Sequence, residues 1–154
     1  PYLLFALSKN GYTDTAYSLL LQNKFPSWLY SVEQGATTIW EHWDGKKEDG
    51  TFWSKDMNSF NHYSYGSVAD WVYEVAAGIK TSEDAAGFKR VVVQPNPDKR
   101  LGMLEASIDT RHGKVSSKWY YDNDKVKYEI TVPVCAEIII DGIVHKVEKG
   151  TYSF

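Results

Sequence analysis

The stretch "YGSVADWVYEVAAGIK", residues 65–80, marks the point where the chain changes its structural period. Its apolar residues recur at the spacing of one helix face: Val68, Trp71, Val72, Val75 and Ala76. Gly78 follows, a residue type that commonly ends a helix. From Phe88 onward apolar and polar residues alternate instead, as is typical of β-strands. We therefore expect a helical part followed by a β part, not a regular alternation of helices and strands.

Toward the C-terminus, strand-like segments are separated by turn residues roughly every ten positions, which is typical of a β-sandwich. The turn signals are Pro95-Asn96-Pro97, His112-Gly113, Asp122-Asn123-Asp124, Asp141-Gly142 and Lys149-Gly150. This pattern predicts an antiparallel β-sandwich domain over residues 86–154, joined through the polar segment "KTSEDAAG", residues 80–87. Cys135 is the one cysteine and lies in a strand-like run, so we expect a buried, unpaired thiol.

Toward the N-terminus, residues 1–85 read as helical, with three stretches before the one quoted above. "PYLLFALSKNG" stops at Asn10-Gly11, "YTDTAYSLLLQNK" offers Thr13 or Asp14 as an N-cap, and "FPSWLYSVEQG" has Ser27 as a cap after Pro26. About four helices are too few to form a domain. They would leave apolar faces such as that of Leu3, Leu4 and Leu7 without partners. We expect this part to complete a larger helical domain.

The composition excludes several classes of function. The net charge of −3 gives no basic stripe for nucleic acid, and no apolar run approaches the ~20 residues of a membrane span. The apolar fraction of 43% is sufficient for a packed core. Aromatic residues reach 15%, including six Trp and eleven Tyr, which favours a carbohydrate, nucleobase or protein surface.

Residues 37–66 form a long segment that is rich in indoles, acids and histidines, and long ordered loops are commonly functional. A metal site is one interpretation, but the spacing of its possible ligands fits neither HExxH nor an EF-hand pattern. Those possible ligands are Glu41, His42, Asp44 and His62. A nucleophilic triad lacks a GxSxG motif. A third interpretation is a glycosidase carboxylate set among sugar-stacking aromatics, where partial desolvation would suit a general base.

A purely structural interpretation of the same segment stays open. Trp40 and Trp43 could be core residues, with neighbouring acids solvated at a helix start. His62 could cap the helix that follows it. The segment "KKED", residues 46–49, carries two lysines followed by two acids and is most simply a solvated loop.

Two motifs carry a family resemblance: "FPSWLYSVEQGATTIWEHWDG", residues 25–45, and "NSFNHYSYGSVADWVYEVAAGI", residues 58–79. They resemble bacterial α-L-rhamnosidases of the (α/α)6-barrel type. The opening "PYLLFALSKNGYTDTAYSLLLQ" resembles a late helix pair of that barrel, and "GFKRVVVQPNP" with "WYYDNDKVKYEITVPV" resembles the family's C-terminal β-sandwich. The resemblance covers essentially the whole chain and implies the end of such a barrel, residues 1–85, followed by the sandwich.

The resemblance implies an inverting exo-glycosidase that releases terminal α-linked L-rhamnose and needs no cofactor. It implies Glu41 as the general base and His62 as a contact to the sugar. Trp40 would either touch the sugar or form the wall that holds Glu41. The family's general acid lies in an acid-rich segment upstream of these motifs, and no such segment occurs in this chain. We therefore expect the chain alone to be inactive.

The rival interpretation is a non-catalytic carbohydrate-binding or structural module formed by the β part. Its candidate residues are Trp119, Tyr120 and Tyr121. Strand alternation places Trp119 and Tyr121 on one face and Tyr120 on the other. A same-face aromatic pair in a sandwich is more often part of the core, which favours packing over glycan binding.

Overall fold

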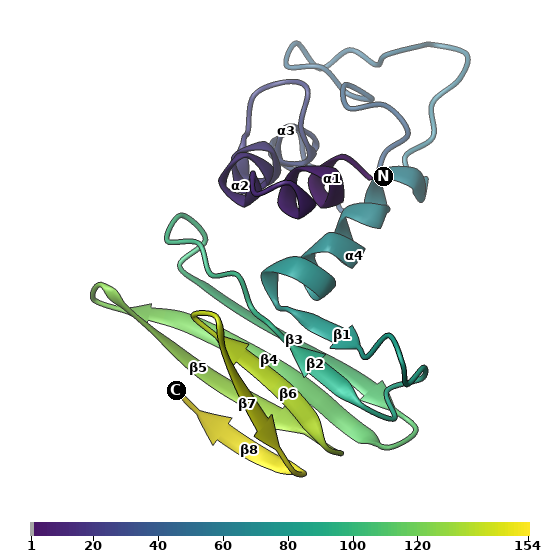
Figure 1. Ribbon diagram of the computed structural model, residues 1–154. Coiled ribbons are helices and arrows are strands. Elements are labelled where there is room, and N and C mark those ends of the chain that lie inside the picture. Colours follow the sequence, from purple (N-terminus) through teal and green to yellow (C-terminus); the bar gives the residue numbers. More distant parts are fainter. Residues whose placement is uncertain (1) are drawn as a thin grey trace. The chain divides into compact units, whose positions relative to one another are not determined.

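The computed structural model describes residues 2–154, and the chain divides into two compact units (Figure 1). The first unit ends at Ala69, and the second is Asp70–Phe154. Helices and a long loop make up the first unit, whereas the second holds the end of the last helix and the β-strands. This order confirms the fold class predicted from the change of period. No helix among the described residues is long and apolar enough to cross a membrane.

Three short helices open the first unit, and a further helical segment follows the long loop. Their bounds are α1 Leu3–Lys9, α2 Thr13–Leu21, α3 Trp28–Glu33, the 3-10 helix η1 Ser64–Ser67 and α4 Val68–Trp71. The chain leaves α1 through Asn10 and Gly11, the stop predicted from sequence. Gly11 has a φ of +84°, which glycine adopts without steric cost.

The predicted caps of α2 and α3 have different outcomes. Ser27 caps α3 as expected, because its hydroxyl accepts a hydrogen bond from the Tyr30 N–H at 3.0 Å. The prediction for α2 is wrong: its N-cap is Tyr12, without a side-chain cap, and Thr13 lies inside the helix. Asp14 instead lies in the first turn, where a carboxylate interacts favourably with the helix dipole.

The helices bury only part of their apolar surface within the first unit. Leu4 is buried, contrary to the expectation that it lacks partners, and Ala16 and Tyr17 of α2 are buried as well. Leu3 remains 61% exposed, as expected. Other exposed apolar side chains in and between these helices include Tyr2, Tyr12, Phe25 and Val32.

The last helix ends where the sequence predicts, at Gly78. After α4 it continues as a π-helical segment, η2 Val72–Ala76. Gly78 has a φ of +76°, and a Cβ atom there would lie 2.1 Å from the Gln94 carbonyl, so only glycine fits. The first strand, β1 Ile79–Thr81, starts at once and pairs with β2. Strands therefore begin before Phe88, because "IKT" finds an antiparallel partner in the following valines.

The second unit contains two four-stranded sheets, with the orders β1-β2-β6-β7 and β3-β4-β5-β8. The remaining bounds are β2 Val91–Val93, β3 Met103–Thr110, β4 Gly113–Asp122, β5 Lys125–Val132, β6 Ala136–Ile140, β7 Ile143–Val147 and β8 Gly150–Ser153. All neighbouring pairs are antiparallel except β2 and β6, which are parallel, so the first sheet is mixed. Alternating burial along β4 and β6 follows from one face of each sheet packing inward.

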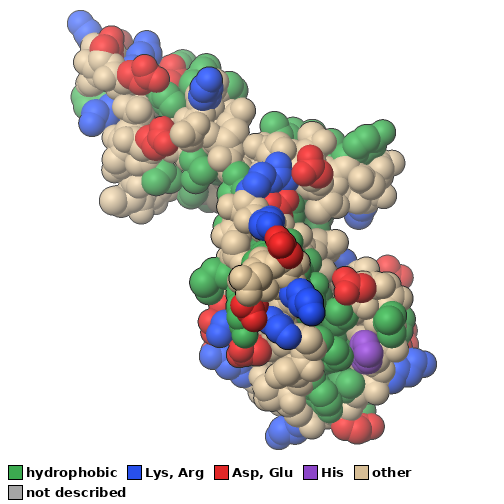
Figure 2. All heavy atoms as spheres, turned by 90° about the vertical axis from the view of Figure 1, so that its left-hand side faces the viewer, with side chains coloured by type: hydrophobic (Ala, Val, Ile, Leu, Met, Phe, Trp, Pro, Cys, Tyr) green, Lys and Arg blue, Asp and Glu red, His purple; other side chains and the backbone are tan. Residues whose placement is uncertain are grey.

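Side chains from both sheets form one core, which makes this unit a β-sandwich. Trp119 is completely buried in it, and its ring meets that of Tyr121 edge-on at a centroid distance of 6.5 Å. Both aromatic residues therefore pack inward, as predicted for the core interpretation. Tyr120 lies beneath the Lys118 ammonium group instead. Figure 2 shows charged side chains of both signs interspersed over the visible surface.

The end of the last helix is hydrogen-bonded to the sandwich. Trp119 Nε1 donates to the carbonyl oxygen of Ala76 at 2.9 Å, and Ser117 Oγ donates to that of Ala77 at 2.7 Å. Asn96 Nδ2 donates to the carbonyl oxygen of Val75 at 2.9 Å. These side chains satisfy carbonyl groups that a helix end leaves without partners. The helix terminus is thus part of the second unit.

The predicted burial of Cys135 is wrong, because the side chain of this free cysteine is exposed. Cys135 lies after the end of β5 and before β6, outside the alternation that buries strand residues. Its thiol donates to Glu148 Oε2 at 3.0 Å. That hydrogen bond and the charge of Glu148 raise the pKa of the thiol.

Candidate active site

The long loop of the first unit is closed at its base by hydrogen bonds between two segments. The Glu41 N–H donates to the carbonyl oxygen of Ser59 at 2.9 Å, and the His62 N–H donates to that of Ile39 at 2.7 Å. Thr38 Oγ1 also donates to the carbonyl oxygen of Phe60. Segments 38–41 and 59–62 therefore lie side by side. This loop base brings together Glu41 and His62, the two principal site residues predicted from the sequence.

Trp40 is a buried wall of the loop base, with 7% of its surface exposed. Its ring meets Phe60 edge-on at a centroid distance of 5.2 Å. Gly45 lies against both rings: a Cβ atom there would be 3.1 Å from Phe60 and 3.2 Å from Trp40. The aromatic pair thus packs together with Gly45, and Glu41, the next residue after Trp40, has a partly exposed side chain.

Trp43 is held between two other aromatic side chains. Its indole stacks on Tyr65 with a centroid distance of 3.8 Å and an interplanar angle of 15°. It also meets Trp28 of α3 edge-on at 5.1 Å. Trp43 therefore packs against other aromatic side chains, which agrees with the structural interpretation that the sequence left open for it.

His62 does not cap the following helix through its side chain. Its Nε2 lies 3.2 Å from the hydroxyl of Ser64, and the N-cap position of η1 is Tyr63, without a side-chain cap. The ring of His62 also stacks against that of Tyr63 at 5.5 Å, and Tyr63 is 86% exposed. The contact with Ser64 and the stacking on Tyr63 orient the imidazole ring.

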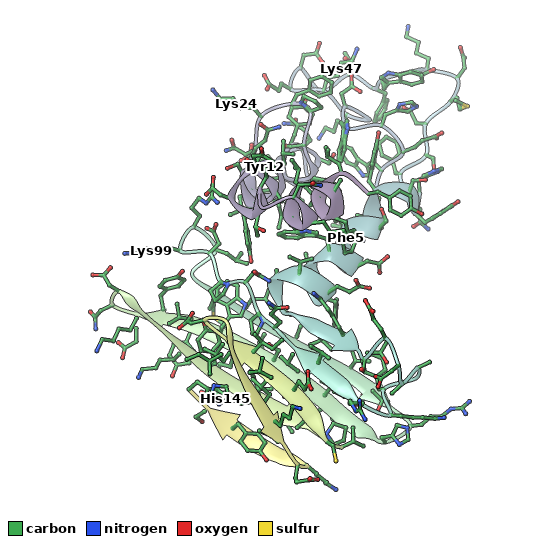
Figure 3. All side chains as sticks on the ribbon, viewed as in Figure 1. Phe5, Tyr12, Lys24, Lys47, Lys99 and His145 are labelled. Carbon is green, nitrogen blue, oxygen red and sulfur yellow. The ribbon has the colours of Figure 1, made fainter. Side chains whose placement is uncertain are left out.

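The rest of the loop is ordered by local contacts. His42 stacks on Trp53 at a centroid distance of 3.7 Å, and the Trp53 N–H donates to the carbonyl oxygen of Gly45. Asp49 Oδ1 accepts from both the hydroxyl and the N–H of Thr51, which lowers the pKa of Asp49. Lys47 lies toward the outer end of this loop (Figure 3). In residues 46–49 the side chains are mostly exposed, in keeping with the predicted solvated segment.

An open pocket of about 390 Å³ lies in the first unit, lined by Phe25, Tyr30, Asp44, Lys47, Glu48 and Asp49. Burial, followed by the charges of Glu48 and Asp44, raises the pKa of Tyr30. Asp44, one of the possible site residues named from the sequence, thus lines this pocket and lies near Tyr30. Within residues 2–154, no three His, Cys, Asp or Glu side chains are grouped so that they could hold a metal ion.

Two family models match the chain in succession. Residues 1–76 match the bacterial α-L-rhamnosidase 6 hairpin glycosidase domain, and residues 78–149 match the bacterial α-L-rhamnosidase C-terminal domain. The chain belongs to the bacterial α-L-rhamnosidase family. The two models meet at the end of the last helix, whereas the structural units divide at Ala69.

Similar members of the α-L-rhamnosidase family support this assignment. The α-L-rhamnosidase of Streptomyces avermitilis is 46% identical over 119 residues, which are 77% of this chain and 11% of that protein. The α-L-rhamnosidase of Alteromonas sp. is 38% identical over 141 residues, which are 90% of this chain and 15% of that protein. The chain therefore spans a small fraction of the length of these relatives.

Solved rhamnosidase structures share the fold. The Streptomyces avermitilis α-L-rhamnosidase complexed with L-rhamnose superposes with a TM-score of 0.88 at 36% identity, over 98% of this chain and 17% of that one. The Aspergillus terreus α-L-rhamnosidase gives a TM-score of 0.87 at 33% identity, over 99% of this chain and 18% of that one. The helices and the sandwich therefore correspond to part of a larger α-L-rhamnosidase fold.

Sequence reasoning missed the contacts that link α3 to the chain just beyond each segment of the loop base. Trp28 Nε1 donates to the carbonyl oxygen of Tyr65 at 2.9 Å, across 37 positions of sequence. Ser31 Oγ donates to the carbonyl oxygen of Trp43 at 2.9 Å. The spacing of Trp28 and Ser31 by three positions on one helix could have suggested that they share a face, but it carries no sign of the partners.

Proposed function

We propose that this chain is the C-terminal part of a glycoside hydrolase that removes terminal α-linked L-rhamnose from glycans or glycosides. Membership of the rhamnosidase family supports the reaction class. The observation that carries the residue assignment is the loop base, where hydrogen bonds tie the Glu41 segment to the His62 segment. A carboxylate and an imidazole fixed on neighbouring segments suit a water-activating base and a hydrogen-bonding contact to a sugar.

In this proposal Glu41 is the general base of an inverting reaction. Its carboxylate removes a proton from a water molecule, whose oxygen bonds to the anomeric carbon of rhamnose. At the same time the bond from that carbon to the glycosidic oxygen breaks, and a general acid protonates the departing oxygen. The transition state has oxocarbenium character, so a fixed carboxylate next to the reacting carbon also stabilises the developing charge.

His62 contacts the sugar in this scheme, and Trp40 supports Glu41 from within the loop base. The Nε2 of His62 is directed at Ser64, so its Nδ1 is the nitrogen that would meet a rhamnose hydroxyl. Because Trp40 is buried against Phe60, we favour its role as the wall beside Glu41 over a direct sugar contact.

The general acid comes from another part of the polypeptide. An inverting enzyme needs two carboxyl groups about 6.5–9.5 Å apart, with room for the water. The acid-rich segment that the family resemblance implies is not among these residues, and the chain spans only 11% and 15% of two relatives. We therefore propose that the 154-residue chain does not hydrolyse rhamnosides by itself. The exposed Tyr2, Leu3 and Tyr12 would pack on the remaining helices of the catalytic domain.

An aryl α-L-rhamnoside assay tests this function. The full-length enzyme should release the aryl alcohol, and the 154-residue chain alone should not. Proton NMR at early times should detect the β anomer of L-rhamnose before mutarotation, because inversion converts the α linkage to a β hydroxyl. Turnover by the isolated chain would contradict the need for an upstream acid. The α anomer as the first product would contradict inversion.

A further inference from the structure

Two side chains of α3 donate hydrogen bonds to the chain just beyond the loop base. The hydroxyl of Ser31 donates to the carbonyl oxygen of Trp43, which follows Glu41 by two residues. The indole N–H of Trp28 donates to the carbonyl oxygen of Tyr65, which follows His62 by three residues. One helix therefore contacts the chain just beyond each of the two proposed site residues.

The spacing of these two donors is fixed by helix geometry. Residues three apart on an α-helix lie on the same face, with Cβ atoms about 5–6 Å apart. The N-terminus of α3 is fixed as well, because Ser27 caps the helix and only 2% of the surface of Ser27 is exposed. Both carbonyl groups are therefore hydrogen-bonded to neighbouring positions of the same helix.

The rings reinforce the same connection. Trp43 stacks on Tyr65 at 3.8 Å and meets Trp28 edge-on at 5.1 Å. Each of these three aromatic side chains comes from a different segment: α3, the Glu41 side of the loop, and η1 after His62. Packing between them resists sliding of one segment past another, which the hydrogen bonds alone would permit.

We propose that Trp28 and Ser31 are positioning residues that fix Glu41 relative to His62, and we call Trp28, Ser31, Trp43 and Tyr65 the α3 clamp. This inference rests on the proposed function of Glu41 and His62. Ser31 holds the segment that follows Glu41, the proposed general base. Trp28 holds the segment that follows His62, the proposed sugar contact. Displacement of a catalytic group by about 1 Å can cost on the order of 100-fold in rate, so a loosened clamp should reduce turnover.

Substitutions in the full-length enzyme test the two hydrogen bonds of the clamp separately. Ser31→Ala removes the hydrogen bond beside Glu41 and should lower kcat about tenfold or more while KM changes little. Ser31→Thr keeps a hydroxyl and should recover most of the loss. Trp28→Phe keeps an aromatic ring but removes the N–H beside Tyr65, so it should raise KM for the aryl rhamnoside as well as lower kcat. The split between kcat and KM distinguishes positioning from a general loss of folded protein.

Two side chains of the β-sandwich supply matched controls. Ser117 also donates from a buried serine hydroxyl to a backbone carbonyl, and Trp119 also donates from an indole to a backbone carbonyl at 2.9 Å. Ser117→Ala and Trp119→Phe should reduce thermal stability and leave kcat of the folded enzyme unchanged. Equal losses of kcat in Ser31→Ala and Ser117→Ala would overturn the proposal.

A double-mutant cycle with Glu41→Gln gives the decisive comparison. If Ser31 acts through Glu41, then Ser31→Ala should lower kcat in the natural background and have little further effect once Glu41 is Gln. An equal loss of kcat in both backgrounds would overturn the clamp proposal without affecting the proposed function. A kcat of Ser31→Ala within twofold of that of the natural enzyme would do the same. Near-normal turnover of Glu41→Gln by itself would contradict the proposed function, and the clamp with it.

Discussion

The N–H of His62 donates to the carbonyl oxygen of Ile39 at 2.7 Å, two residues before Glu41. Together with the hydrogen bond from the Glu41 N–H to Ser59, this contact joins the two motifs that carry the family resemblance. The backbone segments that carry the proposed base and the proposed sugar contact are therefore hydrogen-bonded to each other. A substitution at either residue can be interpreted as a change in chemistry or in binding, since the backbone beneath both stays hydrogen-bonded.

Replacement of the imidazole should weaken both sugar binding and turnover. In the full-length enzyme, His62→Ala removes a hydrogen-bonding group from the sugar, which should lower kcat/KM for an aryl α-L-rhamnoside by roughly 10–100-fold, equivalent to about 1.4–2.7 kcal/mol. His112→Ala, in an exposed turn of the sandwich, is the control and should have normal kinetics. An unchanged kcat/KM for His62→Ala would leave that histidine a structural role only.

A methyl group at Gly45 should disturb the wall beside Glu41. Its Cβ atom would lie 3.1 Å from Phe60 and 3.2 Å from Trp40, so the rings would have to move. We expect Gly45→Ala to lower the free energy of unfolding by about 1–3 kcal/mol and to reduce kcat. Gly66→Ala is the matched control, because its Cβ atom meets only Ile39 at an ordinary 3.4 Å. Equal stability of the two variants in urea unfolding would contradict this packing argument.

The turn around Asp98 should make the stability of the sandwich depend on pH. Hydrogen bonds from Arg100, through its guanidinium and its backbone N–H, lower the pKa of Asp98 in the folded protein. Its stabilising contribution is therefore fully present above the unfolded-state pKa and is lost as pH falls through the folded-state pKa.

Asp98→Asn tests this dependence in the 154-residue chain. At pH 7 the variant should be less stable by about 1–2 kcal/mol, because a carboxylate partner of Arg100 is lost. The difference from the natural sequence should begin to shrink below about pH 4, where the carboxyl group becomes protonated in the unfolded state, and should continue to shrink as pH falls through the lower folded-state pKa. Asp109→Asn, on an exposed position of β3, is the control. A difference that stays constant between pH 7 and pH 3 would exclude the linkage.

Local sequence signals predicted the elements whose causes are local. Ser27 caps α3 because its hydroxyl needs only the N–H three residues later. Gly78 ends the last helix because its φ of +76° suits glycine, and alternation along β4 placed Trp119 in the core. Glu41 and His62 could be named as candidate site residues because each lies in one of the two motifs that carry the family resemblance.

Contacts between distant segments could not be predicted in the same way. The parallel pairing of β2 with β6 depends on which strands become neighbours, and turn residues do not encode that choice. Cys135 is exposed because β5 ends three residues before it. The apolar residues on both sides of Cys135 gave no sign of that strand end in the sequence. The hydrogen bond from Trp28 to Tyr65 spans 37 positions, and neither residue type specifies the other as its partner.

The central claim is that Glu41 activates the water that attacks rhamnose. Its most direct test is the kcat of Glu41→Gln in the full-length enzyme with an aryl α-L-rhamnoside, beside Glu48→Gln as a control in the same loop. Gln keeps the size of the side chain and removes the base, so kcat should fall by roughly 10²–10⁴-fold, whereas Glu48→Gln should remain close to normal. Near-normal kcat in Glu41→Gln would contradict the account.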